Sequence, residues 1–111
     1  MKAIGYRTPG PITDEASLVD IELSDPVPTG RDILVQVRAV SVNPVDFKVR
    51  GSSAPEGDAW KVLGWDASGV VVATGPETTL FKAGDKVFYA GSIIRPGTNA
   101  ELHLVDERIV G

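Results

Sequence analysis

Cysteine is absent from this sequence of 111 residues, and histidine occurs once, as His103. No disulfide can therefore form within the chain, and neither a thiolate site nor a multi-histidine site for zinc can be assembled from it. A calcium or magnesium site made of carboxylates alone would need a loop of regularly spaced Asp and Glu residues, and no such loop is apparent. We therefore expect no metal site, and in particular no zinc.

Long apolar runs and clusters of one charge are also missing. No run approaches the ~20 apolar residues that a membrane-spanning helix needs, and the first residues lack the pattern of a signal peptide. The formal net charge is −4, and the basic residues are scattered singly. A stripe of positive charge that could neutralise phosphates is therefore absent. These features predict a cytoplasmic protein with neither a membrane nor a nucleic-acid partner.

The residues that are present predict one mainly β domain over 1–111. Twelve glycines and eight prolines separate short apolar runs. Strands are expected at 1–6, 18–23, 33–42, 70–73, 86–90 and 100–105, and a short helical turn at 44–50, where Pro44 suits the first helical position. Many short strands with turns between them indicate a sandwich or a small barrel.

Alternation of apolar and polar residues predicts which side chains are buried. The run 70–73 is almost wholly apolar, which indicates a strand buried on both faces. In the last strand, alternation places the leucines inside and His103 on the solvent side. The expected core consists of Ile33, Val35, Val37, Val70, Val72, Val87, Leu102 and Leu104.

Four segments carry a resemblance to a known family: 37–46 (VRAVSVNPVD, continuing to Arg50-Gly51), 64–71 (GWDASGVV), 81–87 (FKAGDKV) and 97–102 (GTNAEL). Each is weak alone, but the four occur in family order and spacing across nearly the whole chain. Together they resemble the N-terminal, substrate-side domain of medium-chain dehydrogenases/reductases. The resemblance implies a GroES-like fold, which is a partly open β-barrel with short helices.

The departures from the family pattern narrow this resemblance. Zinc-dependent members have a cysteine ligand where this chain has Asn43, and a His-Glu pair where it has Trp65 and Asp66. The chain is therefore most similar to the zinc-free quinone oxidoreductase branch. That resemblance implies transfer of hydride from NADPH to quinones or other activated alkenes, including enones, with the cofactor supplying the reactivity.

Members of that branch also contain a Rossmann domain, whose Gly-rich turn binds the dinucleotide. No G-x-G-x-x-G occurs in this sequence. The expectation is a domain of a longer two-domain enzyme, inactive by itself and unable to hold NADPH alone. Relatives of this type often form homodimers, largely through the cofactor domain, so the oligomeric state stays open.

The resemblance suggests site residues, and each has a plainer alternative. Asn43 is the candidate to donate to a substrate carbonyl or to hold the nicotinamide ribose; it could instead be a turn residue before Pro44. Asp46 could assist in cofactor binding or only fix the turn. Lys48 could stabilise a developing oxyanion or be a solvated surface lysine. Trp65 could form an apolar wall for a flat substrate or be an ordinary core tryptophan.

A different class of function remains as the alternative: a stand-alone GroES-like binding or assembly module, similar to a co-chaperonin and without enzymatic activity. Such a module would use a long mobile loop with an apolar tip. The expected loop at 51–58 (GSSAPEGD) is largely polar, which favours the oxidoreductase.

Overall fold

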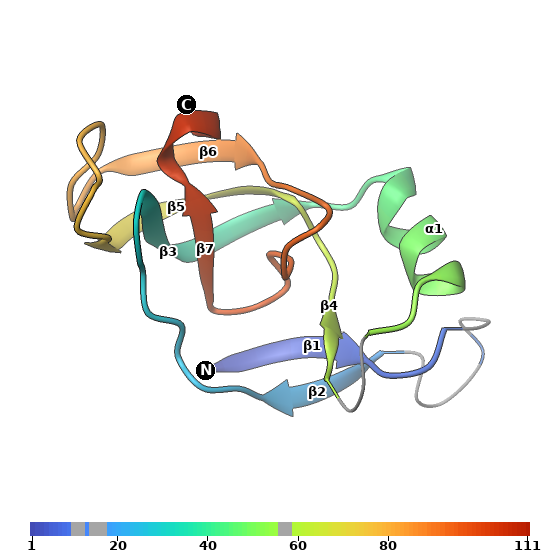
Figure 1. The fold of residues 1–111 in the computed structure, drawn as a ribbon. Helices are drawn as coiled ribbons and strands as arrows, with labels where there is room; N and C mark the ends of the chain where they lie inside the picture. Colours follow the sequence, from blue (N-terminus) through green and yellow to red (C-terminus); the bar gives the residue numbers. More distant parts are fainter. Residues whose placement is uncertain (10–12, 14–17, 56–58) are drawn as a thin grey trace.

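The computed structural model describes residues 1–9, 13, 18–55 and 59–111. A small antiparallel sheet lies at the N-terminal end of this part of the chain, in the order β2-β1-β4. Its strands are β1 (Lys2–Tyr6), β2 (Val19–Glu22) and β4 (Lys61–Val62). Figure 1 shows this sheet below the rest of the molecule, with the N-terminus at the start of its central strand, β1.

A larger antiparallel sheet has the order β6-β5-β3-β7. It consists of β3 (Asp32–Ser41), β5 (Asp66–Thr74), β6 (Lys86–Ala90) and β7 (Leu102–Asp106). The longest strand, β3, pairs with β5 along its whole length and with β7 only over its first half. The register between β3 and β5 shifts twice, and such irregularities bend and twist a strand. The fold is mainly β, as the sequence predicts, and its strands form two antiparallel sheets.

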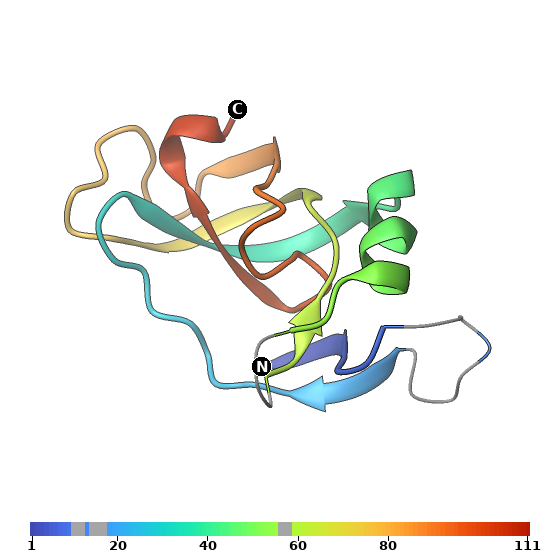
Figure 2. The same ribbon diagram turned by 45° about the vertical axis from the view of Figure 1, so that its right-hand side comes forward.

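The helix α1 (Pro44–Ser52) directly follows β3 and lies beside the end of that strand in two views (Figures 1 and 2). It begins as predicted, with Pro44 at its first position, but it continues through Gly51, which was expected to lie in a loop. The hydroxyl of Tyr6 lies 2.6 Å from the carbonyl oxygen of Ser53 and 3.0 Å from that of Val49. These contacts tie the end of the helix to β1.

Among the described residues, no helix is long and apolar enough to cross a membrane. Residues 56–58 of the expected loop at 51–58 lie outside the described part of the chain.

The core has two clusters of buried side chains. One lies on the larger sheet and consists of Ile33, Val35, Ala67, Val71, Val87, Tyr89 and Val105, and the other consists of Tyr6, Leu63 and Trp65. The predicted burial of Ile33, Val35 and Val87 is confirmed. Val37 is only partly buried and packs against the first cluster.

The faces predicted for β5 and β7 are wrong. Val70, Leu102 and Leu104 are only half-buried, and Val72 is 42% exposed. In antiparallel sheets, residues directly opposite each other point to the same face. Because Val35 pairs with both Val71 and His103, the odd-numbered residues of β5 and β7 share the buried face of β3. The strand at β5 is therefore not buried on both faces.

His103 is correspondingly buried, with 5% of its surface exposed, instead of facing solvent. Its Nδ1 lies 2.8 Å from the hydroxyl of Tyr89, and its Nε2 lies 3.0 Å from the carbonyl oxygen of Pro96. The rings of Tyr89 and His103 are stacked, with centroids 5.6 Å apart. A buried polar ring is tolerated here because both of its nitrogens have partners.

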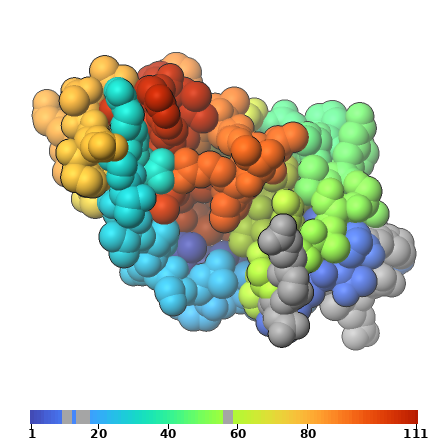
Figure 3. Space-filling view, in the orientation of Figure 1, coloured from blue at the N-terminus to red at the C-terminus, as the bar shows by residue number. Residues whose placement is uncertain are grey.

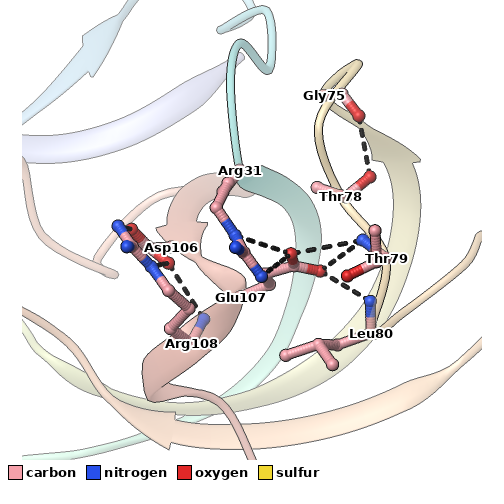
Figure 4. Close-up of polar contacts among 8 residues, drawn as sticks. All are labelled: Arg31, Gly75, Thr78, Thr79, Leu80, Asp106, Glu107 and Arg108. Carbon is pink, nitrogen blue, oxygen red and sulfur yellow. Dashed lines mark hydrogen bonds and ion pairs between the residues drawn. The ribbon is translucent and has the colours of Figure 1, made fainter.

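A buried carboxylate holds the loop between β5 and β6. Glu107 begins the short 3-10 helix η1 (Glu107–Ile109) and is fully buried. Its carboxylate accepts hydrogen bonds from the backbone N–H groups of Thr79 and Leu80 and forms an ion pair of 2.9 Å with Arg31 (Figure 4). Three segments that are distant in sequence are thereby fixed to one another.

Candidate functional site

The predicted site lies where β3 ends and α1 begins. The backbone N–H of Asn43 donates to the Asp46 carboxylate at 2.7 Å, and the backbone N–H of Asp46 donates to the Asn43 carbonyl at 2.9 Å. This reciprocal pair satisfies groups that the first turn of a helix would otherwise leave unpaired. Asp46 is buried, and its second oxygen, Oδ1, has no hydrogen-bond partner among the described residues. The structure thus gives Asp46 the turn-fixing contact expected as one of its two roles.

The side chain of Asn43 makes a contact that the sequence did not suggest. Its Nδ2 donates to Oδ2 of Asp66 at 2.8 Å. Asp66 is the first residue of β5 and pairs with Ser41 in the ladder between β3 and β5. Because 23 positions separate Asn43 from Asp66, only the pairing of the two strands could have indicated that these residues are neighbours. The site therefore contains Asp66 in addition to the residues predicted for it.

A surface hollow of about 380 Å³ lies beside this contact. It is lined by Asp66 together with Ser41, Ser68 and Phe88, among others. Asn43 and Asp66 are themselves only partly buried. Polar groups next to an open hollow are accessible to a small molecule, as binding sites require.

Trp65 precedes Asp66 and is 3% exposed. Its ring belongs to the second core cluster with Tyr6 and Leu63, and Val45 and Val49 of α1 pack against that cluster. Its indole N–H has no partner within the described part of the chain. A ring buried to this extent has little surface left to contact a substrate, and the substrate wall remains a prediction.

Lys48 lies on the exposed side of α1. Its backbone carbonyl accepts from the hydroxyl of Ser52 at 2.6 Å. Among the described residues, its side chain forms no hydrogen bond with Asn43 or Asp66, and its role at an oxyanion stays a prediction. Trp60, before β4, stacks under the guanidinium of Arg7 at 4.1 Å.

A smaller hollow of about 200 Å³ is lined by Asp46 together with Phe47 and Leu63, among others. Two further hollows lie away from the predicted site residues. A hollow of about 410 Å³ lies between the segment that follows β2 and the segment that leads into β7. Figure 3 shows the surface hollowed between these segments. It is mainly apolar, with Leu23, Pro26 and Leu102 among its walls. Another, of about 780 Å³, is lined by residues of β1 and β2 and by 99–101.

The residues that the structure describes do not form a ligand set suited to zinc. The only imidazole belongs to His103, and both of its nitrogens are within hydrogen-bond distance of Tyr89 and Pro96. Within the described ranges, no three His, Cys, Asp or Glu side chains gather as a metal site would require. Zinc sites in proteins normally use at least three such ligands.

The fold and this strand-helix site define a GroES-like oxidoreductase domain. Residues 29–110 match the model of the alcohol dehydrogenase GroES-like domain, and the chain belongs to that family.

Individual relatives agree with this assignment. The chain is 49% identical to a zinc-type alcohol dehydrogenase-like protein of Staphylococcus aureus (strain COL), covering 99% of this chain and 32% of the relative. It is 71% identical, with a TM-score of 0.97, to the crystal structure of a Rhizobium etli CFN 42 protein described provisionally as a zinc-dependent alcohol dehydrogenase. That match covers 100% of this chain and 32% of the other.

The structure of Escherichia coli quinone oxidoreductase complexed with NADPH is also similar. The identity is 26%, the TM-score is 0.86, and the match covers 100% of this chain and 32% of that one. The chain therefore spans about a third of the length of the relatives that it matches. It is similar to the N-terminal part of larger oxidoreductases.

Proposed function

We propose that this domain forms the substrate side of the cleft in an NADPH-dependent oxidoreductase that reduces quinones or other activated alkenes without zinc. The observation that carries the proposal is the hydrogen bond of 2.8 Å between Asn43 and Asp66. These residues occupy two of the positions at which zinc-dependent members of the family have metal ligands, while Trp65 occupies the third. An amide, a carboxylate and an indole ring here support a cleft that polarises its substrate through hydrogen bonds.

The names of relatives point in two directions. The Staphylococcus aureus and Rhizobium etli proteins are described as zinc-type or zinc-dependent, whereas the Escherichia coli protein is a quinone oxidoreductase complexed with NADPH. The ligand set of this chain supports the second direction, because zinc needs imidazole, thiolate or clustered carboxylates. NADPH, when bound by the full enzyme, would supply the hydride.

The residues of this chain would bind the substrate and orient it. The Asn43 amide has a second N–H for a substrate carbonyl and an oxygen that can accept from a hydroxyl. Asp46 would act mainly by holding the backbone of Asn43 in place. Orientation of this kind accelerates hydride transfer by placing the reacting atoms in contact before the reaction.

The proposal is tested on the full-length enzyme that contains this domain. NADPH oxidation is followed with a quinone, an enone and an aldehyde, before and after dialysis against a chelator, and zinc is measured in the same preparation. We expect reduction of the quinone or the enone, unchanged by the chelator, and far less than one zinc per chain. Chelator-sensitive reduction of the aldehyde with one tightly held zinc per chain would refute the proposal.

A further inference from the structure

The Asn43 amide has a defined orientation in the site. A carboxylate can only accept hydrogen bonds, so the Asn43 group that faces Oδ2 of Asp66 at 2.8 Å must be Nδ2. The chemistry of the partner thus removes the usual ambiguity between the nitrogen and oxygen of an amide. Oδ1 is then directed away from Asp66, and one Nδ2 proton is left over.

Both residues of this pair stand on backbone that is itself held in place. Asp66 pairs with Ser41 in the ladder between β3 and β5. Asn43 exchanges two backbone contacts with Asp46, at 2.7 and 2.9 Å. The backbone therefore holds the Asn43 amide and the Asp66 carboxylate in one relative position.

We propose that Asp66 is a positioning residue that sets the polarity of Asn43. With the Asp66 side chain as its partner, Asn43 presents one acceptor and one donor to the cleft, each at a fixed position. Without it, the amide can rotate by half a turn and exchange the two. Donation to the Asp66 carboxylate also shifts electron density towards Oδ1 of Asn43, which strengthens that oxygen as an acceptor. This inference rests on the proposed function.

The first test is a double-mutant cycle in the full-length enzyme, with kcat/KM for quinone reduction as the readout. The variants are Asp66→Asn, Asn43→Ala and the double variant. Asp66→Asn keeps the shape but can present either a donor or an acceptor to Asn43. We expect it to lower kcat/KM by roughly tenfold in the wild-type background and by less than about twofold in the Asn43→Ala background. Equal losses in the two backgrounds would overturn the inference.

A matched control is Asp85→Asn. Like Asp66, Asp85 is partly buried and accepts one hydrogen bond, from the backbone N–H of Lys82 at 2.9 Å, but it lies in the turn before β6. It should leave kcat/KM within about twofold of wild type. A tenfold loss in this control would show that the enzyme responds to the loss of any carboxylate, which would refute the positioning role of Asp66.

A second measurement does not depend on activity. In full-length enzyme labelled with ¹⁵N-asparagine, the side-chain amide resonance of Asn43 is identified by its loss in Asn43→Ala. We expect Asp66→Asn to shift one of its two proton resonances and Asp85→Asn to shift neither. An unshifted resonance overturns the positioning role. If the wild-type enzyme reduces neither quinone nor alkene, the proposed function falls, and this resonance alone decides whether Asp66 orients Asn43.

Discussion

The hydroxyl of Tyr89 donates to Nδ1 of His103 inside the larger sheet, across 2.8 Å. The direction of this bond follows from the other ring nitrogen. Nε2 faces the carbonyl oxygen of Pro96 at 3.0 Å, and a carbonyl can only accept, so Nε2 carries the proton and Nδ1 is the acceptor. The histidine is thereby held neutral, in one tautomer, between β6, β7 and the segment that connects them.

This arrangement predicts a pH dependence of stability. Burial lowers the pKa of His103 below its ordinary value of 6.5, and Arg95 adds to the effect, while the Pro96 carbonyl and Asp32 oppose it. The unfolded chain therefore takes up a proton near pH 6.5 and the folded chain only at lower pH. The contribution of His103 to the free energy of unfolding should be constant above about pH 6.5 and fall as the pH decreases from there towards the folded-state pKa.

Urea unfolding of the 111-residue chain between about pH 7 and about pH 5.5 measures this slope, above the range in which carboxylates titrate and below that of the N-terminal amine. His103 is the only histidine in the sequence, so His103→Gln should remove the slope while lowering stability at every pH. An identical slope in that variant would contradict the prediction.

Glu107 provides a second prediction. Burial alone would raise its pKa, but the amides of Leu80 and Thr79 and the Arg31 guanidinium outweigh burial and hold the pKa below 4.5. The contribution of the Glu107 carboxylate to the free energy of unfolding is therefore present above about pH 4.5, and it is lost as the pH falls through the folded-state pKa. Glu107→Leu should lower the thermal midpoint by on the order of 10 °C at neutral pH.

Glu107→Gln is the matched variant, because its amide oxygen can still accept from Thr79 and Leu80. It should lower the midpoint less than Glu107→Leu does, and it should weaken the acid dependence relative to wild type. Equal midpoints for the two variants, measured by circular dichroism, would mean that the backbone contacts contribute little.

Sequence reasoning located most of the strands, but it missed β4 and the first half of β5, and it assigned the wrong faces to β5 and β7. Alternation in β7 offers two equal solutions, with Leu102 and Leu104 inside or with His103 and Val105 inside, and the apolar pair was the natural choice. The pairing of Val35 with His103 decides the matter, and that register depends on contacts across the chain. The contact between Asn43 and Asp66 was missed for the same reason. By contrast, the start of α1 at Pro44 is local and was predicted correctly.

Two glycines of opposite environment give a third prediction. A Cβ at Gly97 would clash with the carbonyl oxygen of Leu63, which is backbone and cannot move aside, whereas a Cβ at Gly51 would have nothing within 4 Å. Gly97→Ala should therefore prevent normal folding. Gly51→Ala, within α1, should stabilise the chain by up to about 1 kcal/mol through helix propensity. Urea unfolding of both variants checks the contrast, and similar behaviour of the two would contradict it.

A fourth prediction concerns the ring of Trp65 in the full-length enzyme. If the ring forms a wall for a flat substrate, Trp65→Ala should lower kcat/KM for an aromatic quinone more than for a small enone. The variant also loses core packing against Tyr6 and Leu63, at about 3–5 kcal/mol. Measuring both substrates on one preparation cancels the fraction of unfolded enzyme. Leu63→Ala is the control that loses packing but keeps the ring, and it should affect both substrates equally. An equal loss for both substrates in Trp65→Ala would leave that residue as part of the core only.

The last prediction is that the 111-residue chain by itself neither reduces quinones nor binds NADPH. Hydride transfer requires the nicotinamide to be held in contact with the substrate, and that placement depends on binding the phosphates and the ribose of the cofactor. In doubly wound folds, a Gly-rich turn and the N-terminus of a helix bind the pyrophosphate, and this sequence has no G-x-G-x-x-G. Asn43 and Asp66 can offer only one wall of a cleft, and the net charge of −4 does not attract a polyanion.

Titration of the chain into NADPH, followed by the fluorescence of the cofactor, should show no saturable change up to high micromolar concentrations. The full-length enzyme, titrated in the same way, is the positive control. Micromolar binding by the 111-residue chain would show that residues 1–111 contain a cofactor site of their own, and the assignment of this domain to the substrate side alone would be wrong.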